Sequence, residues 1–119
     1  MRNFRDLEVW KFSIILVKKI YLITGKFPNE EKFGLVSQIN RCSVSIPSNI
    51  AEGCSRSSQK DFSRFLQISL GSSFELETQI EIAKEVGFID ENLYSEIIFE
   101  LNTIQKRIQS LKKYVDSKV

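Results

Sequence analysis

Arg41 and Glu52 are the two residues that most resemble part of an active site, because they set a cation and a carboxylate in a polar stretch. If they share one helix, they lie about 16 Å apart and cannot contact each other. A hairpin with the following helix would place Arg41 opposite Glu75. The same hairpin would bring Glu52 near Arg64. We therefore expect two cross-helix ion pairs that fix the helix register, and the alternative is a polar site for a ligand or a neighbouring subunit.

A second candidate for chemistry is the acidic series Glu77, Glu81 and Glu85, which follows Glu75. Its spacing of four residues places the three carboxylates on one face of a helix. Metal-binding bundles of the di-iron type combine such carboxylates with histidine in Glu-x-x-His motifs. This chain has no histidine. We therefore expect a solvated acidic face that holds no metal.

The absence of histidine also removes the commonest acid–base group of enzymes. Small helical ribonucleases of the HEPN type need an arginine followed within a few residues by a histidine, and that pattern is missing here. The sequence contains no glycine-rich phosphate loop and no nucleophile–base pair. We predict that the protein is not an enzyme and uses no cofactor.

The two cysteines, Cys42 and Cys54, bear on the cellular compartment. On one helix they lie about 18 Å apart, so they cannot form an intrachain disulfide. We expect both to be small buried residues in a reducing environment. Charged residues interrupt the apolar residues at the N-terminus, and no segment is long and apolar enough to span a membrane. The sequence therefore predicts a cytoplasmic protein with no membrane partner.

Four amphipathic segments must position these side chains. We expect the first helix over residues 6–24 and the second from a cap at Asn29 to about residue 54. A third follows a capping box at Ser58 and ends before Gly87, and a fourth follows a cap at Asp90. Long helices with short links predict one all-α domain over residues 1–119, folded as an up-down-up-down antiparallel four-helix bundle.

The second helix carries an apolar face and, beside it, a polar stripe. Charged side chains next to an apolar seam suggest that this stripe is partly buried. The polar stripe consists of Gln38, Arg41, Ser45, Ser48 and Glu52. The third helix has a patch of small residues that would face Ser43 and Ser45 across the hairpin and let the backbones approach closely. This patch consists of Ser69, Gly71, Ser72 and Ser73.

The first helix has apolar residues over most of its circumference. One seam begins at Trp10 and a second begins at Val9, so the helix needs partners on two sides. In the fourth helix, Ile98 and Phe99 lie off the main seam. A single bundle cannot cover all this apolar surface, and we therefore expect a homo-oligomer.

Charge is distributed unevenly, although the net charge is only +2. In an up-down-up-down bundle, both termini and the turn between the second and third helices lie at one end. Eleven basic and five acidic residues gather there, whereas the rest of the chain has six basic and ten acidic residues. The basic residues that we expect to contact nucleic acid are Arg56, Lys60, Arg64, Lys106, Arg107, Lys112 and Lys113. The alternative is that the separation of charge is only a favourable arrangement of charges and dipoles within the bundle, and that the basic end binds no partner.

The order Gln38-x-x-Arg41, followed by Ser45-Ile46-Pro47-x-Asn49-Ile50-Ala51-Glu52-Gly53, resembles the four-helix-bundle family named for proteins encoded in intervening sequences of bacterial 23S rRNA genes. The polar residues of this run include Asn49. A second run, Gly71-Ser72-x-x-Glu75-Leu76-Glu77, also matches the family and contains Glu75. Further matches extend over nearly the whole chain: Phe4-x-x-Leu7-x-Val9-Trp10, Phe27-Pro28, Phe33-Gly34-Leu35 and Phe65-Leu66.

This family is similar to the accessory proteins of diversity-generating retroelements, which form pentameric barrels and associate with reverse transcriptase and nucleic acid. The resemblance thus implies a homopentamer, with RNA or DNA and a nucleic-acid-processing protein as partners. We expect a non-enzymatic, oligomeric protein that binds nucleic acid or associates with a ribonucleoprotein. The alternative is a protein–protein interaction scaffold with no nucleic-acid role.

Overall fold

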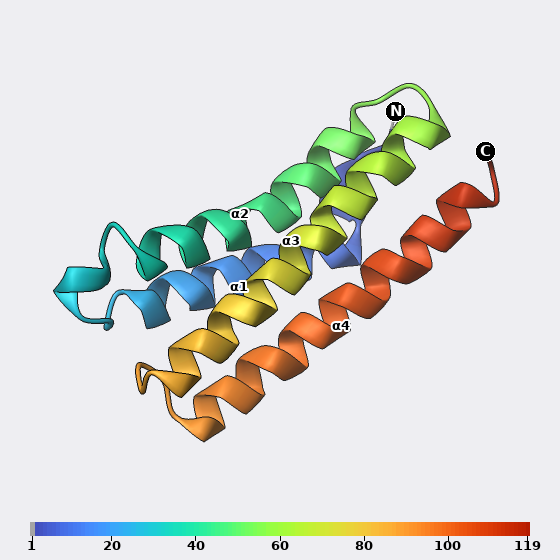
Figure 1. The fold of residues 1–119 in the computed structure, drawn as a ribbon. Coiled ribbons are helices and arrows are strands. Elements are labelled where there is room, and N and C mark those ends of the chain that lie inside the picture. Colours follow the sequence, from blue (N-terminus) through green and yellow to red (C-terminus); the bar gives the residue numbers. More distant parts are fainter. Residues whose placement is uncertain (1) are drawn as a thin grey trace.

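The computed structural model describes residues 2–119, which form an antiparallel bundle of four long helices with up-down-up-down connections (Figure 1). No strand occurs within these residues. The bundle is elongated, with extents of 45 × 24 × 20 Å. The helices are α1 (Glu8–Thr24), α2 (Leu35–Cys54), α3 (Gln59–Glu85) and α4 (Glu91–Asp116), and two short 3-10 turns are η1 (Phe4–Asp6) and η2 (Asn29–Glu31).

Among neighbouring helices, α2 and α3 form the most extensive contact, and α1 and α4 form the least extensive one. Both termini lie at the same end as the turn between α2 and α3 (Figure 1). This arrangement confirms the predicted fold. No helix of residues 2–119 combines the length and apolar character needed to cross a bilayer.

The helix ends follow local capping rules in most places. The Ser58 hydroxyl accepts a hydrogen bond from the Asp61 amide at 3.0 Å, and the Asp90 carboxylate accepts one from the Leu93 amide at 2.8 Å. Gly87 adopts a φ of 85° just after α3, a conformation that glycine adopts without steric cost. The positions of these three ends were predicted correctly. The capping box at Ser58 forms only in part, because no hydrogen bond from the Ser58 amide to the Asp61 carboxylate occurs within residues 2–119.

Two helix starts differ from expectation. Asn29 does not cap the second long helix, because it opens the separate turn η2. A turn then leads to Gly34, whose φ and ψ of −108° and −112° interrupt the helical path before α2 begins. Likewise α1 begins at Glu8 because η1, capped by the Asn3 side chain, occupies the residues before it.

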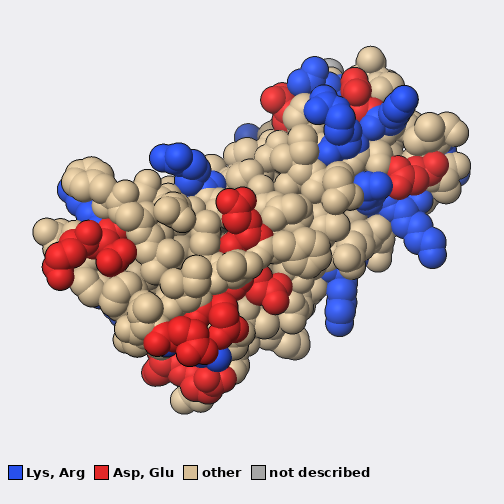
Figure 2. Space-filling view, in the orientation of Figure 1, with Lys and Arg blue, Asp and Glu red and all other residues tan. Residues whose placement is uncertain are grey.

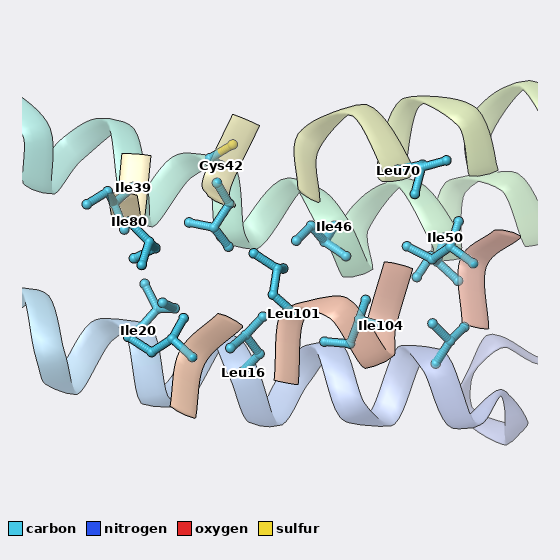
Figure 3. Packing of buried hydrophobic residues seen from close by; sticks show 14 of the residues in the cluster. Leu16, Ile20, Ile39, Cys42, Ile46, Ile50, Leu70, Ile80, Leu101 and Ile104 are labelled. Carbon is cyan, nitrogen blue, oxygen red and sulfur yellow. The ribbon is translucent and has the colours of Figure 1, made fainter. Parts of the chain in front are cut away.

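The core is a single cluster built from one face of each helix. Its side chains point toward the bundle axis from all four helices (Figure 3). Each fully buried Leu or Ile contributes about 1.5–3 kcal/mol relative to an exposed one. The members with almost no exposed surface include Leu16, Ile20, Ile39, Ile46, Ile50, Leu66, Leu76, Ile80, Leu101 and Ile104.

Small residues do bring α2 and α3 close together, as predicted. The Ser45 and Ser72 hydroxyls are 2.8 Å apart, and the buried Ser69 hydroxyl donates to the Ile46 carbonyl at 2.9 Å. Gly71 is an exception, because it is exposed and a Cβ there would meet no atom within 4 Å. Its small size is therefore not required by this contact.

Both cysteines are buried and free of a disulfide. Burial, followed by the nearby Glu75 carboxylate, raises the pKa of Cys42 to about 11. Burial also raises the pKa of Cys54, and the Arg2 charge opposes this shift. Both thiols are therefore neutral packing groups near pH 7.

Candidate nucleic-acid interface

Basic side chains concentrate at the end of the bundle that carries the termini, while acidic ones gather toward the other end (Figure 2). The candidate residues come from two segments. Arg56, Lys60 and Arg64 belong to the α2–α3 turn and the first turns of α3, and the other four belong to the C-terminal half of α4. All seven are exposed except the half-buried Lys112.

Aromatic side chains support the guanidinium groups at the α2–α3 turn. The Cζ atoms of Arg56 and Arg64 lie 4.8 and 4.6 Å from the ring centre of Phe65. Arg2 lies 4.2 Å from the ring centre of Phe62 and also donates to Gln59. Stacking of this kind fixes a guanidinium and leaves its N–H donors free for an anion.

Two hollows adjoin these basic residues. One of about 550 Å³ is lined by polar and basic residues of the turn, including Arg2 and Arg56. Another of about 520 Å³ lies between the start of α1 and α4 and includes Lys106 and Arg107. The guanidinium of Arg107 also lies 4.7 Å from the ring centre of Phe12. The basic end thus offers concave as well as flat cationic surface.

Not every candidate is equally available to a partner. Lys112 pairs with Asp116 at 2.9 Å. A hydrogen bond from Ser63, followed by that from Lys112, lowers the pKa of Asp116. Arg64 lies 3.9 Å from Asp61. Within residues 2–119, Lys106 and Lys113 have no acidic partner within 4.0 Å, so their charge is not offset locally.

The two predicted cross-helix ion pairs are wrong. No pair within 4.0 Å joins Arg41 to Glu75, or Glu52 to Arg64, in the part of the chain that the structure describes. All four side chains are exposed, and exposed pairs gain little in water. Arg64 instead lies against Phe65 and near Asp61.

The polar stripe is also more exposed than expected. Gln38, Arg41, Ser48 and Glu52 face solvent, and only Ser45 is half-buried. The motif residue Asn49 bonds within α2, because its Nδ2 donates to the Ser45 carbonyl at 2.8 Å and to its hydroxyl at 2.9 Å. Asn49 therefore holds the Ser45 side chain, and the Ser45 hydroxyl in turn bonds to Ser72 of α3.

Arg41 and Glu75 do line one groove between α2 and α3, about 300 Å³ in volume. We refer to it as the polar groove, and its lining consists of Gln38, Arg41, Cys42, Ser45, Ser72, Glu75 and Gln79. The Cys42 thiol donates to the Ser72 carbonyl at 3.1 Å. The sequence analysis did not identify Gln79 as a residue of this groove. The signal that could have revealed it is a polar residue between the core positions Leu76 and Ile80.

The acidic series on α3 is less solvated than expected. Glu77 and Glu81 are half-buried, and only Glu85 is exposed. Glu77 accepts a hydrogen bond from Gln105 at 2.9 Å, and Glu81 accepts one from the Tyr94 hydroxyl at 2.6 Å. This face therefore joins α3 to α4. No group of three or more potential metal ligands occurs among residues 2–119.

Helix α1 leaves apolar surface uncovered. Ile14, Ile15 and Leu22 are exposed, and on α4 the Phe99 side chain is 74% exposed. Ile15 and Phe99 line an apolar groove of about 220 Å³ between α1 and α4. Ile98, by contrast, is half-buried and packs against the core. The seam that begins at Val9 is therefore not the uncovered one, because its residues Leu16 and Ile20 lie in the core. Exposed apolar surface does remain on α1, and at Ile15 it lies on the α1–α4 side.

Comparison with known proteins agrees with the resemblance seen in the motifs. The family described as 23S rRNA-intervening sequence protein matches residues 5–110. A crystal structure of a protein of unknown function from the S23 ribosomal protein family of Bacteroides thetaiotaomicron is similar, with 29% sequence identity and a TM-score of 0.82. The match covers 88% of this chain and 95% of that chain. No curated protein matches the chain.

Proposed function

The chain belongs to the 23S rRNA-intervening sequence protein family, and we propose that it is a non-enzymatic homo-oligomer that binds nucleic acid through its basic end. The observation that carries the proposal is the gathering of eleven basic residues at that end against five acidic ones. The family name supports RNA as the first nucleic acid to consider. The likeness to retroelement accessory proteins suggests a nucleic-acid-processing protein as a further partner.

The basic end binds phosphates rather than base edges. Its cations come from several separate segments, and the guanidinium groups of Arg56 and Arg64 lie against the largely buried Phe65. Groups held in this way suit contacts to phosphate oxygens, which position a protein on nucleic acid without reading its sequence. Affinity should fall steeply with salt, since each neutralised phosphate releases counterions.

Oligomerisation would strengthen this binding. The uncovered apolar face of α1, with Phe99 of α4, suits a second copy of this chain, because it adjoins the loosest helix contact of the bundle. A pentamer is the assembly we propose, by likeness to retroelement accessory proteins. Each subunit would present its basic end, so that weak phosphate contacts add by avidity.

The test is charge reversal with a matched control. Changing Lys106, Arg107 and Lys113 to Glu should abolish binding of RNA and DNA oligonucleotides, measured by fluorescence anisotropy at several salt concentrations. This set leaves the Lys112–Asp116 pair intact. The control reverses Lys18, Lys26 and Lys32, which are exposed and lie on α1 or after it. The control has the same net charge and should retain binding.

A protein–protein scaffold without a nucleic-acid role is the second candidate, and the exposed apolar face favours it. Equal binding by both charge-reversed variants and the parent would show that the basic end is a solubility feature. Absence of oligonucleotide binding by the parent at low salt would have the same meaning. The scaffold would then be the better account.

A further inference from the structure

Some of the polar side chains that line the polar groove between α2 and α3 have no partner in the described part of the protein. It involves residues 38–45 of α2 and 72–79 of α3. These segments lie away from the α2–α3 turn, which belongs to the basic end (Figure 1). None of the seven residues proposed to bind nucleic acid lines this groove. Its occupant can therefore be considered separately from nucleic acid.

Gln79 provides the first indication of a ligand. Its side chain is 7% exposed, and within residues 2–119 its amide oxygen has no hydrogen-bond partner. Its neighbours Leu76 and Ile80 are fully buried, so an apolar residue would suit position 79 without an unsatisfied acceptor. Burying such an acceptor costs free energy unless a donor reaches it. A glutamine thus stands here at a cost in stability. Within residues 2–119 its amide nitrogen also has no partner and, unlike the oxygen, is not shielded, so Gln79 offers an N–H donor to an occupant of the groove.

Arg41 and Glu75 provide the second indication. They line the groove from α2 and α3 respectively, and neither forms an ion pair within 4.0 Å in the described part of the chain. Opposite charges that line one groove without meeting match a small molecule that carries both charges. Each end of that molecule would find a complementary group.

We propose that the polar groove binds a small zwitterion of the α-amino acid class. The ligand's ammonium group donates to the Glu75 carboxylate, and its carboxylate accepts from the Arg41 guanidinium and the Gln79 amide nitrogen. The volume of about 300 Å³ corresponds to about ten water molecules of ~30 Å³ each. This size suits a single amino acid rather than a nucleotide chain.

The remaining groove residues are compatible with non-covalent binding. The Cys42 thiol is already a donor to the Ser72 carbonyl, and its high pKa keeps it neutral near pH 7. It therefore neither repels the ligand's carboxylate nor acts as a nucleophile. The Ser45 and Ser72 hydroxyls are bonded to each other and offer one further polar contact.

The test is a titration of the full-length, ¹⁵N-labelled protein with each of the twenty standard amino acids. We expect at least one of them to shift the side-chain amide resonances of Gln79, with affinity then measured by calorimetry. Two analogues of that ligand, one without the carboxylate and one without the amine, should bind at least about tenfold more weakly, since each loses one charged contact. Equal binding by either analogue would overturn the proposal, as would the failure of all twenty amino acids to shift Gln79.

Variants provide an independent check. Arg41→Gln and Glu75→Gln should each weaken binding about tenfold, and both side chains are exposed, so that the fold is kept. Arg5→Gln and Glu85→Gln are the matched controls, because both side chains are exposed and lie outside the groove, and these variants should bind amino acids as the parent does. Unchanged affinity in both groove variants would overturn the proposal. The charge-reversed variant of α4 should retain amino acid binding, so that failure of the nucleic-acid proposal remains distinguishable.

Discussion

A Cβ atom added to Gly53 would lie 2.8 Å from Cδ1 of Phe62, so glycine alone fits where the last turn of α2 meets the first turn of α3. The same atom would lie 2.9 Å from Cβ of Phe65, which cannot move without its backbone. Phe62 is fully buried, and it also supports the guanidinium of Arg2. The close approach of α2 to α3 thus sets the position of the basic turn.

Gly53→Ala should therefore destabilise the protein by about 1–3 kcal/mol, since an overpacked core must shift. Gly71→Ala is the control, because a Cβ there meets nothing within 4 Å. On the exposed surface of a helix this control should stabilise the protein by up to about 1 kcal/mol. Urea denaturation followed by circular dichroism measures both changes. Equal stability of the two variants would contradict the close contact at Gly53.

Arg41→Ala should change the free energy of unfolding by no more than about 0.5 kcal/mol, as is usual for an exposed residue without a structural partner. Ser69→Ala should cost about 1 kcal/mol, because it removes a buried hydrogen bond to the Ile46 carbonyl. Thermal or urea unfolding of both variants provides the comparison. A loss at Arg41 equal to that at Ser69 would show that Arg41 does pair with Glu75 in solution.

The difference between these two residues shows what could be read from the sequence. Apolar spacing and the caps at Ser58 and Asp90 specify the helices and their order, because these features depend on residues close in the chain. Hairpin register then brings Arg41 level with Glu75, but it does not fix the rotamers of long exposed side chains. The predicted ion pair failed for this reason.

Gln79 was missed for a different physical reason. Its position in the apolar seam of α3 suggests a core residue, and only the packing of α2 beside it shows that its amide oxygen is left without a donor. Asn29 was predicted to cap the second long helix because asparagine is a good capping residue, but it belongs to the short turn η2 and not to the start of α2. Capping preference identifies a helix start but not which helix starts there.

Ile15→Glu combined with Phe99→Glu should dissociate the proposed oligomer, since both residues line the apolar groove between α1 and α4. Buried carboxylates without partners are strongly unfavourable at an interface. Multi-angle light scattering should give five times 13.8 kDa for the parent and 13.8 kDa for the variant. Phe33→Glu is the control, because Phe33 is exposed outside this groove. A parent that has the monomer mass at micromolar concentration would refute the assembly.

The stability contributed by the Cys42 thiol should fall as pH rises from about 9 to about 11. In the unfolded chain the thiol ionises near the ordinary value of 9.0, whereas burial and the Glu75 carboxylate raise the native pKa to about 11. Across this window the unfolded state loses its proton first, so deprotonation favours unfolding. Below pH 9 the thiol is neutral in both states and the contribution is fully present. Cys42→Ala should remove this component of the pH dependence, measured by urea unfolding at pH 8, 9, 10 and 11 against the parent.

The native thiol should also react slowly with iodoacetamide at pH 8, since the thiolate is the reactive form. Parallel pH profiles for the parent and Cys42→Ala, together with rapid alkylation of native Cys42, would show that this thiol is not held neutral by its site.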